Sequence, residues 1–263
     1  MFCRPTRTSG DEEVVVGRSL SIAARVWVAV FVVLVLVHLS AQLTGADSVA
    51  SVSQWALMPA LAAVVLTATR WPRGHVVTWT LVALGFSWLG DLLPDLVGED
   101  AAFLVMVGCF LVAQVGYIVA FAPSARRSVL HRRPLLLVPY AAVLVALVAA
   151  CAPGAGSLLV PVAVYGGALT AMAVLATGLG RLAGIGGAVF LVSDGLIALE
   201  AFVPGWDLGG QGFWVMLTYV VGQALLAAAV VGRNVAERRA PEPSPVRTYV
   251  QRPPVRDNVV ALV

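Results

Sequence analysis

The chain lacks lysine entirely, and it has few charged residues of any kind. All 17 basic side chains are arginines, and charged residues make up 12% of the 263 residues, against about 25% in ordinary soluble domains. Hydrophobic residues make up 60% of the chain, and the mean hydropathy is +0.91. This composition excludes a soluble globular domain and predicts an all-α, polytopic membrane protein.

Cysteine is also scarce, with three residues at positions 3, 109 and 151. The number is odd and no metal-binding spacing occurs, so we predict neither a disulfide nor a metal site and expect no cofactor. Cys109 and Cys151 are expected to be small buried side chains. The first twenty residues are polar and lack a short apolar core, so we expect no cleavable signal peptide and a retained first span.

Eight apolar segments are long enough to cross a bilayer, which takes about 20 residues per helix. We therefore expect a transmembrane domain over residues 24–232, between a disordered N-terminal arm (1–23) and a disordered tail rich in Pro and Arg (233–263). The connections are short, so no soluble domain is inserted. The predicted spans are residues 24–43, 52–69, 76–94, 102–122, 134–152, 157–178, 182–203 and 211–232.

The arginines all fall on one side of this predicted domain, in the N-terminal arm, the even-numbered loops and the C-terminal end. By the positive-inside rule, both termini of a multi-pass protein of the cell membrane are expected in the cytoplasm. The same distribution argues against nucleic-acid binding despite a net charge of +3. The opposite loops contain no arginine and carry Asp47, Asp95, Glu99, Asp100 and Asp207.

Two aspartates lie inside apolar segments, where a membrane should reject them. Asp91 follows Phe86-Ser-Trp-Leu-Gly, and Asp194 follows Phe190-Leu-Val-Ser. A carboxylate at bilayer depth costs at least about 2.5–3.5 kcal/mol on insertion scales, so it usually faces a bundle interior or a wet cavity. No span interior holds an arginine that could form a salt bridge with either aspartate. A functional role therefore fits the pair better than a structural one.

The two aspartate segments also suggest an internal repeat. Each aspartate-containing span is followed by a span that carries a Phe-x-Val-Met segment and a glutamine. Four spans per half would give two parallel four-helix halves. Asp91 and Asp194 would then lie on outward-running helices, near mid-depth or slightly beyond it, where their carboxyls can share one cavity.

Other polar side chains in the spans are candidate substrate-binding residues around this pair. Each has a plainer alternative, because a lone Tyr or Gln in a span can serve only as an interhelical hydrogen bond. The candidates are Gln54, Gln114, Tyr117, Tyr165, Tyr219 and Gln223.

At these residues the chain resembles the YhhN-like lysoplasmalogenase family of eight-span membrane proteins. The resemblance covers roughly residues 50–230, and it is most specific at the two aspartate segments. It implies hydrolysis of the vinyl-ether bond of lysoplasmalogens, with a lysophospholipid as substrate and Asp91 and Asp194 as the acidic pair. Two positions depart from the family pattern: Gln54 replaces a typical Lys, and Gln114 replaces a typical His. Further similar segments are Leu57-Met-Pro-Ala-Leu61, Phe110–Tyr117, Leu159–Tyr165 and Thr218–Gln223.

Vinyl-ether hydrolysis needs an acid that protonates the alkene carbon and an anion that stabilises the resulting oxocarbenium ion. Two carboxyls in one low-dielectric cavity can supply both, as paired carboxylates do in acetal hydrolysis. We expect Asp91 and Asp194 to be catalytic, and the more apolar neighbours of Asp194 favour it as the acid. A proton-coupled lipid transporter and a non-enzymatic lipid-binding protein are the alternative functions.

Overall fold

The computed structural model describes residues 21–239, and every regular element in that range is a helix. The α-helices are α1 (Ile22–Thr44), α2 (Asp47–Ala68), α3 (His75–Leu92), α4 (Glu99–Phe121), α5 (Val129–Arg132), α6 (Leu137–Ala155), α7 (Leu159–Ala176), α8 (Arg181–Phe202) and α9 (Gln211–Arg239).

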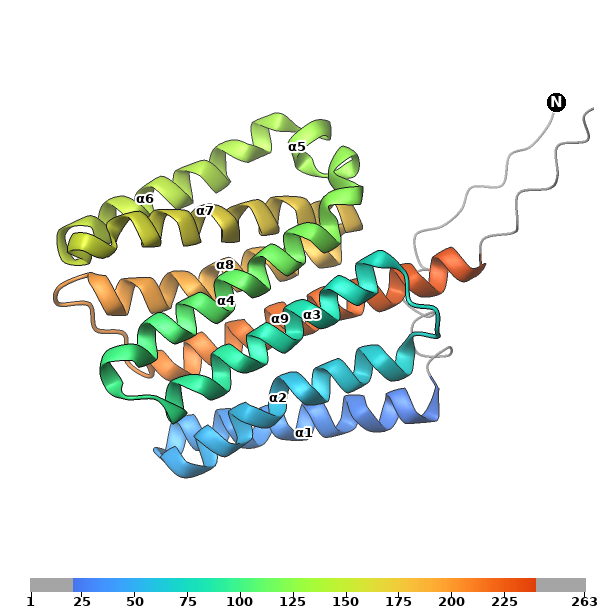
Figure 1. Ribbon diagram of the computed structural model, residues 1–263, viewed down its shortest axis with the longest axis horizontal. Helices are drawn as coiled ribbons and strands as arrows, with labels where there is room; N and C mark the ends of the chain where they lie inside the picture. Colours follow the sequence, from blue (N-terminus) through green and yellow to red (C-terminus); the bar gives the residue numbers. More distant parts are fainter. Residues whose placement is uncertain (1–20, 240–263) are drawn as a thin grey trace, which may run out of the picture.

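Seven helical stretches within the described residues are long and apolar enough to cross a membrane. One of them, Pro134–Leu179, is 46 residues long and turns back on itself near Gly156, so it contributes both α6 and α7 (Figure 1). The eight predicted spans therefore correspond to α1–α4 and α6–α9. The last helix continues to Arg239, beyond the predicted end of its span at residue 232, so the start of the predicted tail is helical. The remainder of that tail, and the predicted N-terminal arm up to residue 20, lie outside the described residues.

These segments form helices because hydrocarbon offers no water to the backbone, so each N–H and C=O must be satisfied within its own segment. Both ends of α1 are capped by residues that favour helix termini. The Ser21 hydroxyl accepts a hydrogen bond from the Ala24 amide at 3.1 Å. Gly45 adopts φ +67° directly after the helix, a conformation that favours glycine.

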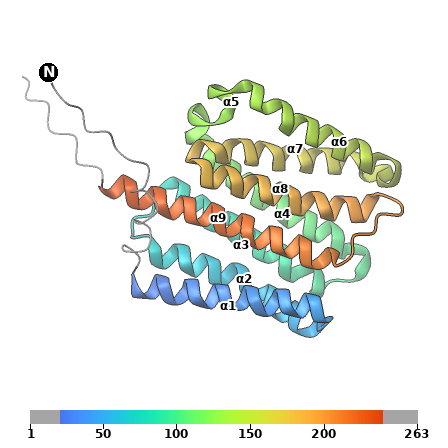
Figure 2. The same cartoon turned by 180° about the vertical axis from the view of Figure 1, so that it is seen from behind.

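The eight long helices form a bundle in which α3, α4, α8 and α9 lie at the centre (Figures 1 and 2). The pair α1–α2 flanks one side of the centre, and α6–α7 flanks the other. Between the two halves of the chain, α4 packs against α7 and α9 packs against α2. A parallel repeat predicts this reciprocal pairing, because α4 corresponds to α9 and α2 to α7.

Close contact between α8 and α9 depends on two glycines. A Cβ added to Gly186 would lie 3.0 Å from the carbonyl oxygen of Gly222, and one added to Gly222 would lie 3.1 Å from that of Gly186. Small residues let helix backbones approach in a membrane, where packing replaces the hydrophobic effect as the source of association. This contact fixes α8, and with it Asp194, against α9.

A proline inside α2 frees a backbone carbonyl of that helix, and a side chain of α3 binds this carbonyl. Pro59 has no N–H, so the carbonyl of Trp55, four residues earlier, loses its helical donor. The indole N–H of Trp88 on α3 donates to that carbonyl at 3.0 Å. Gln54 directly precedes Trp55, and Asp91 follows Trp88 by three residues. The contact between the two tryptophans therefore brings the side chains of Gln54 and Asp91 to the same level of the bundle.

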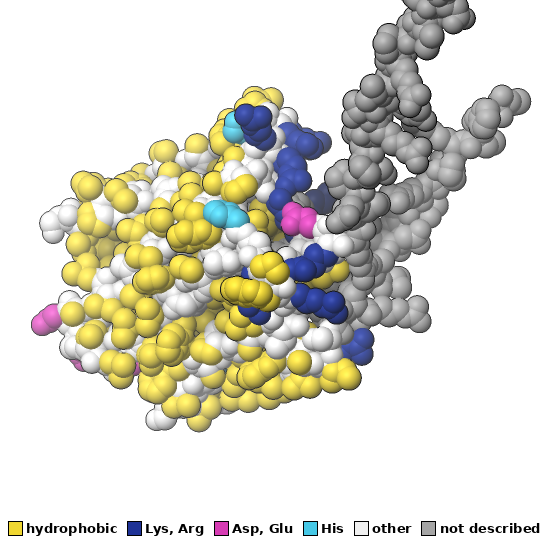
Figure 3. Space-filling view, turned by 45° about the vertical axis from the view of Figure 1, so that its right-hand side comes forward, with side chains coloured by type: hydrophobic (Ala, Val, Ile, Leu, Met, Phe, Trp, Pro, Cys, Tyr) yellow, Lys and Arg dark blue, Asp and Glu magenta, His cyan; other side chains and the backbone are white. Residues whose placement is uncertain are grey.

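The two ends of the bundle differ in charge, as Figure 3 shows. At one end, called the arginine end, Glu237 is the single acidic side chain within residues 21–239. The other end, called the acidic end, carries Asp47, Asp95, Glu99, Asp100 and Asp207. The arginine end carries Arg70, Arg73, Arg126, Arg127, Arg132, Arg133, Arg181, Arg233 and Arg238.

Candidate functional site

Asp91 is the penultimate residue of α3, and its carboxyl is buried in the bundle with 5% of the residue exposed. One carboxyl oxygen accepts a hydrogen bond from the Gln54 amide at 3.2 Å, and the other accepts from the Tyr219 hydroxyl at 2.8 Å. The ring of Tyr219 lies edge-on to Phe110 and Phe190, with centroids 5.7 and 5.6 Å away. Three helices, α2, α3 and α9, thus hold this carboxyl in place.

Asp194 lies on α8, with 7% of the residue exposed. One of its carboxyl oxygens accepts a hydrogen bond from the Tyr165 hydroxyl of α7 at 2.5 Å. Asp194 therefore has one hydrogen-bond donor within the described residues, whereas Asp91 has two.

Both carboxyls lie in the buried interior of the bundle. A second buried group lies on the same central helices: the Tyr117 hydroxyl donates to the side-chain oxygen of Gln223 at 2.5 Å. The Gln223 amide nitrogen in turn donates to the Ser87 hydroxyl at 3.1 Å, one helical turn before Asp91. Polar side chains from six helices, α2, α3, α4, α7, α8 and α9, thus lie together in this region of the bundle.

Gln114 of α4 is also fully buried in this region. Its amide lies near the Tyr165 hydroxyl. Neither the oxygen nor the nitrogen of the amide has a hydrogen-bond partner within residues 21–239. A buried amide without partners is costly, and it is able to bind a polar group that enters the site.

An apolar cleft leads to Asp194. The cleft lies between α4, α6, α7 and α8, and its wall is apolar apart from Asp194 and Tyr165. Asp91 does not line it, so the expectation that both carboxyls face one cavity holds only for Asp194. The wall includes Phe103, Phe110, Leu158, Leu169 and Phe202.

The position of Asp194 along its helix places the site nearer the acidic end. At 1.5 Å per residue, Asp194 lies about 20 Å from Arg181, where α8 begins, and about 12 Å from Phe202, where it ends. Asp91 lies next to the end of α3 on the same side. Asp194 thus lies slightly beyond the middle of its helix, as expected, whereas Asp91 lies closer to the acidic end of its own helix.

The structure brings together all eight residues that the sequence analysis selected, although it assigns them no roles. The sequence analysis did not identify the contact between Trp55 and Trp88. Its one signal in the sequence is Pro59, a proline within an apolar span, which leaves the Trp55 carbonyl without its helical donor. Within residues 21–239, no group of three His, Cys, Asp or Glu side chains could hold a metal ion. Cys109 and Cys151 are free thiols.

Comparison with known proteins adds to this geometry. A family model described as the YhhN family matches residues 49–230, a range that contains all eight residues. Curated proteins named Lysoplasmalogenase from Mycobacterium bovis and Mycobacterium tuberculosis are each 30% identical over 186 residues. Each alignment covers 64% of this chain and 67% of the relative. No solved structure matches the chain significantly.

Proposed function

The chain belongs to the YhhN family, and we propose that it is a membrane hydrolase that cleaves the vinyl-ether bond of a lysoplasmalogen or a related lysolipid. The products are a fatty aldehyde and a glycerophospho-alcohol. The observation that carries the proposal is the buried pair Asp91 and Asp194, each bonded to a tyrosine hydroxyl, with Asp194 facing an apolar cleft. The similar proteins named Lysoplasmalogenase support the reaction class.

Asp194 is the proton donor in this proposal. Its carboxyl faces an apolar wall and has a single hydrogen-bond donor, an environment that favours the neutral acid. Asp91 accepts two hydrogen bonds, from Gln54 and Tyr219, and these stabilise a negative charge on its carboxylate. One carboxyl is thus suited to be the protonated acid and the other to be the charged carboxylate, which is the division of roles that a catalytic carboxyl pair needs.

In the first step, the Asp194 O–H gives its proton to the alkene carbon beta to the ether oxygen. The electron pair of the double bond forms the new C–H bond, and an oxygen lone pair completes an oxocarbenium ion. The negative charge on Asp91 stabilises this cation through the buried, low-dielectric interior of the bundle.

In the second step, water adds to the oxocarbenium carbon and releases a proton to the Asp194 carboxylate. The resulting hemiacetal then loses the glycerol oxygen as an alcohol, which takes up a proton, and the carbonyl of the aldehyde forms. The unpartnered amide of Gln114, near Tyr165, is suited to hold the water. The net reaction consumes one water and restores both carboxyls.

The cleft accounts for the hydrocarbon chain of the substrate. Its wall is aliphatic and aromatic, and it runs from Asp194 between α4, α6, α7 and α8. A lysolipid that places its vinyl ether at Asp194 has its headgroup only a few bonds away. Because Asp194 is about 12 Å from the acidic end of α8 and about 20 Å from the arginine end, the headgroup belongs at the acidic end.

The charge of the two ends supports an orientation in the cell membrane. Arginines mark the cytoplasmic side, so both termini are cytoplasmic in this proposal and the acidic end faces outward. The substrate then enters from the outer leaflet.

The test uses the purified full chain in detergent with three lysophospholipids that differ only in the vinyl-ether, alkyl-ether or ester link to the chain. Mass spectrometry follows the aldehyde and the glycerophospho-alcohol. We expect products from the vinyl ether alone. Asp91→Asn and Asp194→Asn should each lower turnover by about 100-fold or more, the contribution of general acid–base catalysis.

Glu200→Gln is the matched control. Glu200 lies on α8 as Asp194 does, but it is exposed and outside the site, so its substitution should leave turnover unchanged. Product release that persists in folded Asp91→Asn and Asp194→Asn proteins would overturn the mechanism. Proton-dependent lipid uptake into proteoliposomes without any product would instead indicate the transporter, and binding without turnover would indicate a lipid-binding protein.

A further inference from the structure

A second cleft lies at the arginine end, away from the proposed hydrolase site. Loops before α6 and α8 form it, and its volume of about 830 Å³ is within the usual range of ligand sites, about 300–1,000 Å³. Four arginines line it: Arg127, Arg132, Arg133 and Arg181. We call it the arginine cleft.

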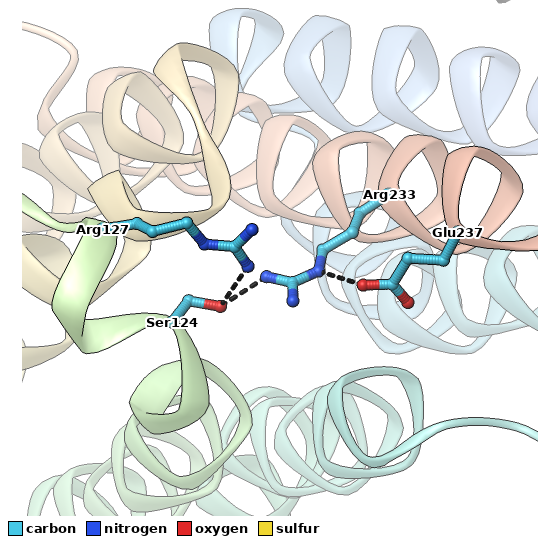
Figure 4. Close-up of polar contacts among 4 residues, drawn as sticks. All are labelled: Ser124, Arg127, Arg233 and Glu237. Carbon is cyan, nitrogen blue, oxygen red and sulfur yellow. Dashed lines mark hydrogen bonds and ion pairs between the residues drawn. The ribbon is translucent and has the colours of Figure 1, made fainter. Parts of the chain in front are cut away.

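Acidic side chains do not neutralise this cleft within residues 21–239. Glu237, the one described acid at this end, forms an ion pair with Arg233 at 2.7 Å and does not line the cleft. Arg233 also donates to the Ser124 hydroxyl, and Arg127 donates to the same hydroxyl from a guanidinium group that lies beside that of Arg233 (Figure 4). Arg127 is thereby held at the edge of the cleft next to a second guanidinium group.

The three other arginines of the cleft are exposed. Within the described residues, the side chains of Arg132, Arg133 and Arg181 form no hydrogen bond or ion pair. Helix α8 begins at Arg181, so the positive end of its dipole adds to the potential. Like charges brought together in this way raise the energy of the folded protein, and an anion relieves that cost.

The wall of the cleft that continues along the bundle is apolar. Leu136 and Pro139 line it from the start of α6, and Ile185 and Ala188 line it from α8. A small free anion would gain nothing from this wall. A lipid would gain from both parts of the cleft, because its headgroup would contact the arginines and its acyl chains would contact the apolar wall.

We propose that the arginine cleft binds the phosphate group of an anionic membrane lipid whose acyl chains lie along the Leu136 and Ile185 wall. Guanidinium groups bind phosphate oxygens through paired, charge-assisted hydrogen bonds. The ends of the spans are also at the level of the membrane where lipid phosphates lie. Bound lipid would connect the α5–α6 segment to the start of α8.

This lipid is distinct from the proposed substrate. Arg181 and Asp194 are about 20 Å apart along α8, whereas the phosphate and the vinyl ether of one lysolipid are separated by only a few bonds. One lysolipid cannot occupy both places during the reaction.

The experiment measures binding to the full chain in detergent by native mass spectrometry, using diacyl lipids that have no vinyl ether to cleave. The probes are dioctanoyl phosphatidylglycerol, dioctanoyl phosphatidylcholine and inorganic phosphate. We expect the anionic lipid to bind more tightly than the zwitterionic one, and inorganic phosphate not to displace it at equal concentration. Because the readout is binding, it is independent of the hydrolase proposal.

The variant Arg132→Gln/Arg181→Gln should weaken phosphatidylglycerol binding about 25-fold, the product of about fivefold for each arginine beside an anionic surface. Arg70→Gln/Arg126→Gln is the matched control, because it removes two exposed arginines at the same end but outside the cleft. Equal weakening in both double variants would mean that surface charge alone attracts the lipid, and it would overturn the proposal. Displacement by inorganic phosphate, or equal affinity of the wild type for the two lipids, would overturn it without any variant.

Discussion

Tyr219→Phe is the most direct test of the role that the structure allows for Asp91. The variant removes one oxygen atom, the hydroxyl that donates to the Asp91 carboxyl at 2.8 Å. The aromatic ring, which packs between Phe110 and Phe190, stays as it is. Tyr219 is 3% exposed, so water cannot readily take the place of the lost donor.

The expected size of the effect follows from the kind of bond. A hydrogen bond to a charged group contributes about 1.5–3 kcal/mol, because the charge strengthens it beyond a neutral pair. At about 1.36 kcal/mol for each factor of ten, Tyr219→Phe should lower kcat/KM for the vinyl-ether substrate by about 10- to 150-fold. The assay is the release of fatty aldehyde by purified protein in detergent.

Tyr140→Phe is the control for this experiment. Tyr140 lies on α6 and has no hydrogen bond within the described residues, so the loss of its hydroxyl should leave aldehyde release unchanged. If Tyr219→Phe retains wild-type kcat/KM while its melting temperature falls, the bond serves only the fold. The assignment of Asp91 as the stabilising anion would then be wrong.

Two predictions concern the helix contacts that place the site. Trp88→Phe should lower the free energy of unfolding by about 1 kcal/mol, because the Trp55 carbonyl loses its donor, and Pro59→Ala, which restores a backbone N–H, should reduce that cost in a double-mutant cycle. Equal effects of Trp88→Phe in both backgrounds would refute this link. Gly222→Ala should destabilise the α8–α9 contact by about 1–3 kcal/mol, since its Cβ would lie 3.0 Å from the Phe190 nitrogen. Gly232→Ala in the same helix meets nothing within 4 Å and should be neutral or stabilising by about 0.5–1 kcal/mol, so a matching loss of thermal stability would contradict the packing argument.

The helices and the aspartate pair could be predicted from the sequence because the bilayer allows few alternatives. An apolar run of span length must form a helix, and a carboxyl within it must face the interior. Hydropathy does not determine the rotation of a helix about its axis when both faces are apolar, and helices such as α8 have almost no polar face. The sequence therefore could not show that Tyr219 bonds to Asp91 and Tyr165 to Asp194, nor that Asp194 alone faces the cleft.

The arginine cleft could not be predicted for a different reason. Its arginines come from two loops that are about fifty residues apart in sequence, and only the packing of α6 against α8 brings these loops together. The positive-inside pattern predicted the end of the bundle at which they lie, but not their arrangement around one hollow.

The two glutamines that replace typical basic residues of the family are compatible with the proposed chemistry. The Gln54 amide donates to Asp91 at 3.2 Å, the same kind of contact that an ammonium group would make. The Tyr219 hydroxyl supplies the second donor, so the carboxylate is stabilised without a cationic partner. Gln114 retains buried donor and acceptor atoms near Tyr165, as an imidazole would, and these atoms are free to orient water. In the proposed reaction the acid and the anion therefore both come from carboxyls, and neither proposed step requires a basic side chain in the spans.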